Sequence, residues 1–163
     1  MLPTINYGPV RDSLRLPNYF SVSADMSSAT WNTVASHEIA TVTGMVHMII
    51  IPECTETLVD AADAAYIQFG YEGLTTALIA STGAAGVGGN AIAAGEIWID
   101  ATPADVFALT SNVRALDVVV NGGLDIGYEI TGAALTEGTM VFHVFWEAIN
   151  ATGAVVAGAG GTL

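Results

Sequence analysis

Lysine is absent from this 163-residue chain, and only Arg11, Arg15 and Arg114 carry a permanent positive charge. Sixteen acidic residues oppose them, so the formal net charge is −13 at pH 7. Phosphate binding depends on clustered lysine and arginine, and we therefore expect no nucleic-acid partner. Anionic membrane surfaces would repel the chain for the same reason, so no membrane partner is expected. The acidity fits a saline habitat, or a genome that avoids lysine codons.

Charged residues of either sign are scarce, at 12% of the chain, whereas hydrophobic residues make up 52%. A soluble domain typically has about 25% charged residues, so we expect other subunits to cover part of the apolar surface. The single cysteine, Cys54, excludes an internal disulfide framework. No apolar run approaches the ~20 residues of a membrane-spanning helix, and the N-terminus lacks the hydrophobic segment of a secretory signal.

The segment SHEIATVTGMVHMIIIPECTE, residues 36–56, contains two of the three histidines, the only cysteine and three glutamates. It begins like the helical zinc motif H-E-x-x-H, but Thr41 occupies the position of the second histidine. Its many β-branched residues favour strands at about 36–43 and 45–51, with a bend or bulge at Gly44. The sequence therefore predicts two strands here rather than a metal site.

Alternation along these two strands assigns each histidine to a sheet face. One face is expected to carry His37, Ile39 and Thr41, and the other strand should present His47 with Met45, Ile49 and Ile51. A metal site would need ligands from elsewhere in the chain, and no motif supplies them.

Further strands are expected wherever apolar residues alternate or β-branched residues cluster. The expected ranges are 65–73, 96–100, 115–121, 124–131 and 139–149. Residues 124–131 alternate most cleanly, and 139–149 are apolar on both faces, which indicates burial on both sides. The dipeptide Asn121-Gly122 is a turn signal.

The remaining segments lack strand periodicity. Residues 55–65 are expected to form a loop, 74–82 a short helix or irregular edge, and 83–95 a mobile Gly/Ala-rich surface loop. Thr102 and Pro103 resemble the start of a short helix that would end near Leu109. The whole pattern predicts an all-β antiparallel sandwich or jelly-roll-like domain with at most one or two short helices.

Three regions are expected along the chain: an extended N-terminal arm at 1–24, a β-sandwich body at 25–149, and a loosely ordered Gly/Ala-rich tail at 150–163. Prolines in the arm forbid a long helix, and its apolar groups together with its two arginines suit an arm that lies across an acidic neighbour. The alternative is a first strand that packs on its own domain. The expected interface residues are Tyr7, Arg11, Arg15, Tyr19, Phe20 and Trp31.

No motif marks a catalytic pair, a cofactor site or a metal site, so none of these is predicted. Cys54 has no evident base, and His143 on an apolar strand is expected to be a core or interface residue. Calcium is an alternative at Asp60 and Asp63 or at Asn121 and Asp125, although the D-x-D-x-D-G spacing is absent. Trp31, Trp98 and Trp146 could form a sugar-binding platform, but core packing is favoured for the last two.

Several segments together carry a resemblance to a known group of proteins. They are WNTVASHEIATVTGMVHMIIIPE, ALIAST, AGEIWIDATP and NGGLDIGYEITGAALTEGTMVFHVFW, which cover most of residues 31–148. The chain resembles short, lysine-poor structural proteins encoded in the gene clusters of tailed bacteriophages. The resemblance implies a virion protein of the capsid decoration (cement) type, and it brings no catalytic residues with it.

The expected function is therefore that of a non-enzymatic decoration protein on the outer surface of a phage head. Its partners would be the major capsid protein and further copies of itself, most simply in a trimer, with assembly in the host cytoplasm. A tail or fibre module that binds a host-surface glycan through Trp31 and residues 83–95 is the alternative. A small cytosolic enzyme is a third hypothesis.

Overall fold

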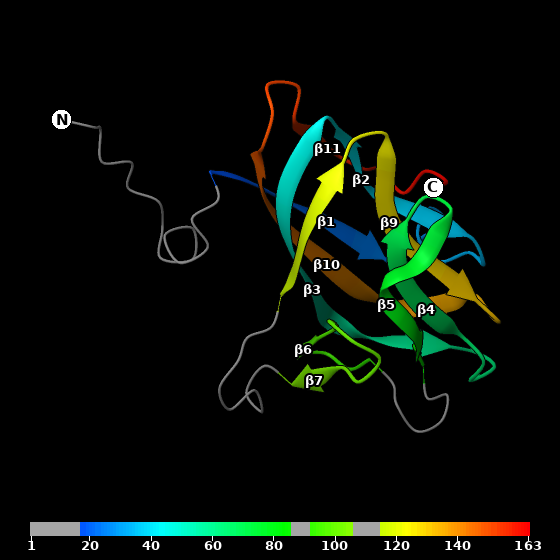
Figure 1. Cartoon of the computed structure of the whole chain (residues 1–163). Coiled ribbons are helices and arrows are strands. Elements are labelled where there is room, and N and C mark those ends of the chain that lie inside the picture. The colour runs from blue at the N-terminus through cyan, green and yellow to red at the C-terminus, as the bar shows by residue number, and fades with distance from the viewer. Residues whose placement is uncertain (1–16, 86–91, 106–114) are drawn as a thin grey trace.

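A computed structural model describes residues 17–85, 92–105 and 115–163 of the chain. The described residues form two antiparallel sheets that pack face to face, and no helix occurs among them (Figure 1). The all-β sandwich expected from the sequence is thereby confirmed.

Each sheet combines strands from both halves of the chain. Sheet A contains β1 (Asn18–Asp25), β3 (Met45–Asp60), β6 (Glu96–Ile97), β7 (Ala104–Asp105), β8 (Leu116–Asn121) and β10 (Leu135–Ala148). Sheet B contains β2 (Ser36–Thr43), β4 (Tyr66–Tyr71), β5 (Leu74–Gly83), β9 (Leu124–Thr131) and β11 (Ala154–Ala157).

The order of the strands is that of a jelly roll. Along the chain, β1 pairs with β10, β2 with β9, β3 with β8 and β4 with β5, as in one long hairpin. Successive strand pairs of this hairpin belong alternately to sheet A and sheet B. In addition, β10 pairs with β3 and β9 pairs with β4. The hairpin is thus rolled into two sheets that enclose a single core.

Two neighbouring corners carry the chain from one sheet to the other. Gly44 joins β2 to β3 with a φ of +64°, and Gly122-Gly123 join β8 to β9. The Gly123 amide donates to the Val42 carbonyl at 3.0 Å, and a Cβ on Gly122 would collide with the Gly44 backbone. The bend expected at Gly44 is therefore present. The turn at Asn121-Gly122 is a corner between sheets rather than a hairpin.

The core lies between the sheets, and aromatic rings from the two sheets stack on each other within it. Phe142 on β10 stacks on Phe69 and on Tyr128, with ring centroids 5.4 and 5.6 Å apart. All three side chains are fully buried, and the last two come from the opposite sheet. Tyr128 also donates its hydroxyl to the Trp31 carbonyl at 2.6 Å, which holds the β1–β2 connection against sheet B.

Two segments that lacked strand periodicity in the sequence belong to strands. The predicted loop at 55–65 is wrong in its first half, because β3 continues to Asp60 while it pairs with β10. Cross-strand hydrogen bonds override weak local patterning there. Residues 74–82 belong to β5, an edge strand of sheet B whose pairing with β4 has two register shifts, so the irregular edge is confirmed and the short helix is wrong.

The predicted helix start at 102–105 is also wrong. Ala104 and Asp105 form strand β7 against β6, and Asp100 accepts hydrogen bonds from the Thr102 amide and hydroxyl in a tight turn. An aspartate two residues before a threonine favours this turn as readily as the threonine favours a helix cap, which explains the error. The rest of the expected helix, residues 106–109, lies outside the described residues.

The C-terminal segment is ordered against sheet B, contrary to the expected loose tail. Strand β11 pairs with β2, after which Gly158 donates to the Ile39 carbonyl and Gly161 accepts from the Glu38 amide, both at 2.7 Å. A Cβ on Gly158 would lie 2.6 Å from the Glu38 carbonyl oxygen. The glycines therefore let the backbone lie close along the edge of β2.

Candidate interaction face

The outer side of sheet A carries an unusual mixture of apolar and ionisable side chains. Across its strands the register aligns Tyr19, Phe145, Ile49 and Asp117 in one row and His143 with Ile51 in the next. We call this surface the A-face. Its residues are Tyr19, His47, Ile49, Ile51, Glu53, Ala115, Asp117, Val119, His143, Phe145 and Glu147.

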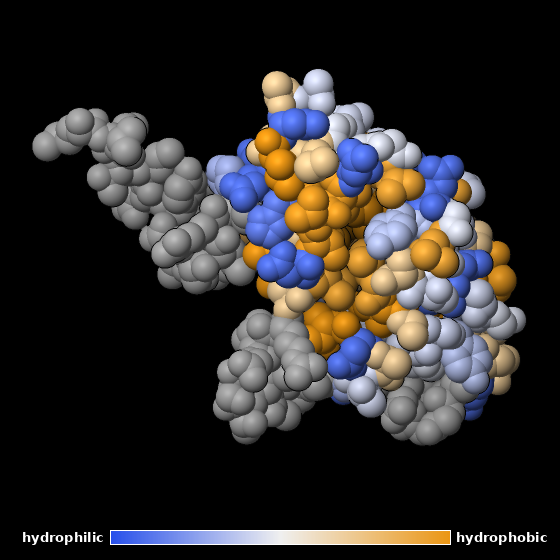
Figure 2. All heavy atoms as spheres, viewed as in Figure 1, coloured by the Kyte–Doolittle hydropathy of each residue, from blue (hydrophilic) through white to orange (hydrophobic). Residues whose placement is uncertain are grey.

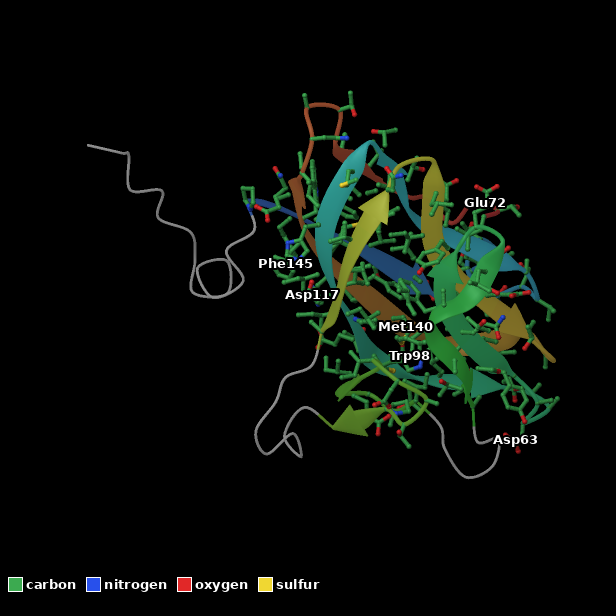
Figure 3. The ribbon with its side chains drawn as sticks, viewed as in Figure 1. Asp63, Glu72, Trp98, Asp117, Met140 and Phe145 are labelled. Atoms are coloured by element: carbon green, nitrogen blue, oxygen red, sulfur yellow. The ribbon has the colours of Figure 1, made fainter. Side chains whose placement is uncertain are left out.

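An apolar strip runs through the centre of the A-face. Phe145 and Ile49 are only 5% and 8% exposed although they point away from the core, and Ile51 and Ala115 pack against them. The Tyr19 ring lies 4.8 Å from the Phe145 ring, whereas Val119 is 63% exposed. Figure 3 shows Phe145 and Asp117 close together on the outer side of the ribbon, while Trp98 and Met140 lie in its interior.

Apolar surface continues around the edge of the sheet at β8. Figure 2 shows hydrophobic residues gathered over β8 and beside it, with hydrophilic residues at the margin. Leu116 and Val118 of this strand are only partly buried where they pack against the core. Apolar residues therefore form part of the molecular surface at β8, as the low charge content of the sequence led us to expect.

Each histidine of the A-face is paired with carboxylates from neighbouring strands. His47 places Nε2 2.7 Å from Asp117 Oδ1 and Nδ1 3.3 Å from Glu147 Oε1. His143 places Nε2 2.9 Å from Glu53 Oε2, and its Nδ1 lies 3.0 Å from the Tyr19 hydroxyl. A neutral His143 can therefore accept from Tyr19 and donate to Glu53 at the same time.

The hydrogen bond that His47 donates to Asp117 is the largest influence on the imidazole and raises its pKa. Partial burial opposes this effect, and Glu147 adds to it. Because the pKa is higher in the folded state, the stabilisation is full below about pH 6.5, the ordinary histidine value. It is lost as the pH rises through the folded pKa.

We expect Asp117→Asn to lower the pKa of His47 and to reduce stability more at pH 5.5 than at pH 8.5. The loss at low pH should be under ~1 kcal/mol, because the pair is solvated. Titration of the His47 ring by NMR and urea unfolding at both pH values measure the two effects. Asp125→Asn, on sheet B, is the control and should leave the His47 pKa unchanged; an equal loss at both pH values would contradict the pairing.

The expected interface residues have different surroundings. Tyr19 belongs to the A-face, whereas Phe20 points inward and packs against the core. Both belong to strand β1, so the alternative of a first strand on its own domain holds from Asn18 onward. Tyr7, Arg11 and Arg15 lie outside the described residues.

The tryptophans do not assemble into one platform. Trp98 is fully buried and donates from Nε1 to Thr82 at 3.0 Å, and Trp146 packs against the core. Trp31 is half-buried, and a Cβ on Gly160 would lie 3.0 Å from its ring, so the C-terminal segment lies against it. Core packing, the favoured interpretation for Trp98 and Trp146, agrees with these contacts. In the segment 83–95, Ala84 and Ile92 are both 0% exposed, whereas Ala94 and Gly95 are exposed. Residues 86–91, the middle of the expected surface loop, lie outside the described residues.

One histidine and the cysteine serve the structure internally. His37 is 3% exposed, and its two ring nitrogens lie 3.0 and 2.9 Å from the Thr30 and Thr33 carbonyls. Burial raises the pKa of the Cys54 thiol to about 12, so the reactive thiolate is scarce at neutral pH.

The bulge between Glu38 and Ala40 shifts the alternation of β2, so Thr41 does not share the face of His37 as expected.

The alternative calcium ligands are engaged elsewhere or separated. Asp60 accepts hydrogen bonds from the backbone amides of Ala62, Asp63, Ala64 and Ala65, so donors rather than a cation surround its carboxylate. Asn121 ends a strand of sheet A, whereas Asp125 lies in sheet B. Within the described ranges, no group of three or more His, Cys, Asp or Glu side chains is placed to hold a metal ion.

The sequence contained two signals for the A-face: the alternation along β3 and the apolar character of both faces of 139–149. The alternation correctly placed His47 with Ile49 and Ile51, but it did not reveal the carboxylates of Asp117 and Glu147. These residues lie 70 and 100 positions away from His47 in the chain.

Comparisons with protein-family models, with curated proteins and with solved structures found no match to this chain. Among the residues that the structure describes, no helix is long and apolar enough to cross a membrane.

Proposed function

We propose that this protein is a non-enzymatic structural component of a tailed-phage virion. It decorates the outer surface of the head as a homo-oligomer, most simply a trimer, binds the major capsid protein and stabilises the shell. The sequence resemblance suggests the particle, and the A-face is the structural observation that supports an assembly role. A sheet surface with a buried apolar strip and a 63%-exposed valine suits contact with another protein.

The A-face is expected to be covered when the protein is on the particle. Closed symmetry would bury the same patch on every copy. Many copies on one shell would add their individual affinities through multivalency, so that each contact need not be strong.

The test uses empty heads of the phage that lack this protein. Purified full-length chain should sediment with these heads and raise their melting temperature. Val119→Asp places a charge on the A-face and should lower occupancy at least 10-fold. Val156→Asp is a matched control, because Val156 is 65% exposed on β11 of the other sheet, and it should bind normally.

Two results would contradict the proposal. The first is failure of the wild-type chain to sediment with heads at any concentration tested. The second is binding to a glycan array that Trp31→Ala abolishes, which would favour the alternative of a tail or fibre module. Equal occupancy by the two valine variants would exclude the A-face as the contact while leaving decoration itself intact.

A further inference from the structure

We propose that residues 1–16 of one copy dock on the A-face of a neighbouring copy, where Arg11 and Arg15 pair with Asp117, Glu147 and Glu53. This inference rests on the homo-oligomer in the proposed function and specifies which surface joins its subunits. The ligand of the A-face is thus a short, mixed apolar and basic segment of a second copy of this chain.

Charge complementarity is the first argument. The side chains of Asp117, Glu147 and Glu53 are 66%, 45% and 40% exposed, so each can accept further hydrogen bonds. The described residues contain no lysine or arginine, because the arginines are at positions 11, 15 and 114. Apart from Arg114, only the N-terminal segment can bring a guanidinium group to this surface. Guanidinium groups bind carboxylates in a bidentate manner and remain charged at all relevant pH values.

Apolar complementarity is the second argument. The apolar side chains that the A-face exposes are Val119 and Tyr19, at 63% and 37%, and they flank the nearly buried strip of Phe145 and Ile49. In the N-terminal segment, Tyr7 and Leu14 accompany the arginines in the sequence. The arginines of the segment therefore match the carboxylates of the A-face, and its apolar side chains match the apolar side chains there.

Electrostatic repulsion excludes the simplest alternative, in which two A-faces pack directly against each other. Each copy has a formal charge of −13, and direct contact would bring carboxylates against carboxylates. An exchanged segment instead carries two arginines and Asp12 into each contact, a net charge of +1. Opposite charges then meet at every A-face in the oligomer.

The segment is also long enough to reach a neighbour. Strand β1 begins at Asn18 on the edge of sheet A, so 17 residues precede it. At ~3.3 Å per residue an extended segment spans roughly 50 Å, whereas four strands about 4.8 Å apart are only ~15–20 Å wide. The reach thus exceeds the width of the chain's own A-face.

The experiment uses two charge-reversed full-length chains. One carries Arg11→Glu and Arg15→Glu, and the other carries Asp117→Arg and Glu147→Arg. Each alone should sediment as a monomer at concentrations where the wild type is oligomeric. An equimolar mixture should form mixed oligomers, because a segment finds a complementary A-face only on the other chain. All contacts are complementary in an even-numbered ring, and two of the three are in a mixed trimer. Recovery in the mixture also shows that both chains are folded.

Two further chains serve as controls. Glu72→Arg with Glu137→Arg makes the same charge change at exposed positions away from the A-face, and this chain should keep the wild-type mass and rescue nothing. A chain with all four reversals restores pairing within one molecule or between molecules. If that chain regains the wild-type properties but the mixture does not, the segment docks on its own copy and the exchange is wrong.

Other outcomes that overturn the exchange are a monomeric wild type, or a reversed chain that keeps the wild-type mass. These results are independent of the phage particle, because no capsid is present. Oligomers that exchange their segments but do not bind heads would refute decoration alone. Binding to heads without exchange would refute only the present inference.

Discussion

Replacement of Phe142 by alanine should lower the free energy of unfolding by about 3–5 kcal/mol. The phenyl ring is fully buried and stacks on Phe69 and Tyr128 of the opposite sheet, with centroids 5.4 and 5.6 Å away. Its removal leaves a cavity between two sheets that cannot close without moving both. The loss is expected to be the same from acid to neutral pH, because burial raises the pKa of Tyr128, the ionisable group in the stack, and keeps its hydroxyl neutral.

Urea unfolding followed by tryptophan fluorescence measures this effect, with Tyr66→Ala as the control. Tyr66 is an aromatic residue of the same sheet as Phe69, but it is 39% exposed, so its truncation should cost less than ~1 kcal/mol. A loss below about 1.5 kcal/mol for Phe142→Ala would show that the interior is loosely packed and would contradict the stacked arrangement.

Replacement of Asp60 by alanine should lower stability at pH 7 by about 2–3 kcal/mol, because hydrogen bonds to a charged group are removed. The carboxylate is held at the end of β3, where it accepts from four backbone amides of the turn that follows. These include Ala64 at 2.9 Å and Ala65 at 2.5 Å. Asp63 within this turn has a positive φ of 49°, so the turn depends on its hydrogen bonds.

The effect of Asp60 should depend on pH. Burial raises the pKa of this carboxyl group, but the four amide donors together outweigh burial and lower it below the ordinary value. A lowered folded pKa means that the stabilisation is complete above about pH 4, the value expected in the unfolded chain, and is lost as the pH falls through the folded pKa.

Chemical unfolding of Asp60→Ala and of the wild type between pH 2 and pH 7 measures the difference. The two stability curves should converge at the acid end. Asp100→Ala is the control, since Asp100 also accepts from a turn, but at an exposed position. It should cost less than ~1 kcal/mol. A gap between wild type and Asp60→Ala that stays constant to pH 2 would contradict a charged carboxylate at this site.

Local patterns predicted strands β9 and β10. In β9 the inward positions Ile126, Tyr128 and Ile130 are all 0% exposed, as the alternation indicated, because burial of one face imposes a period of two on the sequence. In β10 the outward Phe145 is nearly as well buried as the inward Phe142, which agrees with the prediction of a strand that is apolar on both faces.

Features that depend on distant partners were not predictable. The extension of β3 to Asp60 follows from pairing with β10, more than 70 residues later in the chain. The bulge in β2 places Thr41 on the opposite face from His37, and the residues around it do not predict a bulge. The carboxylates around His47 were missed for the same reason, because each comes from a different strand and only the register brings them together.

The rolled hairpin has a consequence for synthesis of the chain. Among the described strands, β1 bonds to β10 alone within its sheet, and Tyr19 pairs with Phe145. This pairing cannot form until β10, more than 100 residues later in the chain, has left the ribosome. Such non-local pairing proceeds on a timescale of about milliseconds to seconds. During that interval the nascent ribbon exposes unpaired edges, and mutual repulsion between its many carboxylates would keep nascent chains apart on a crowded polysome.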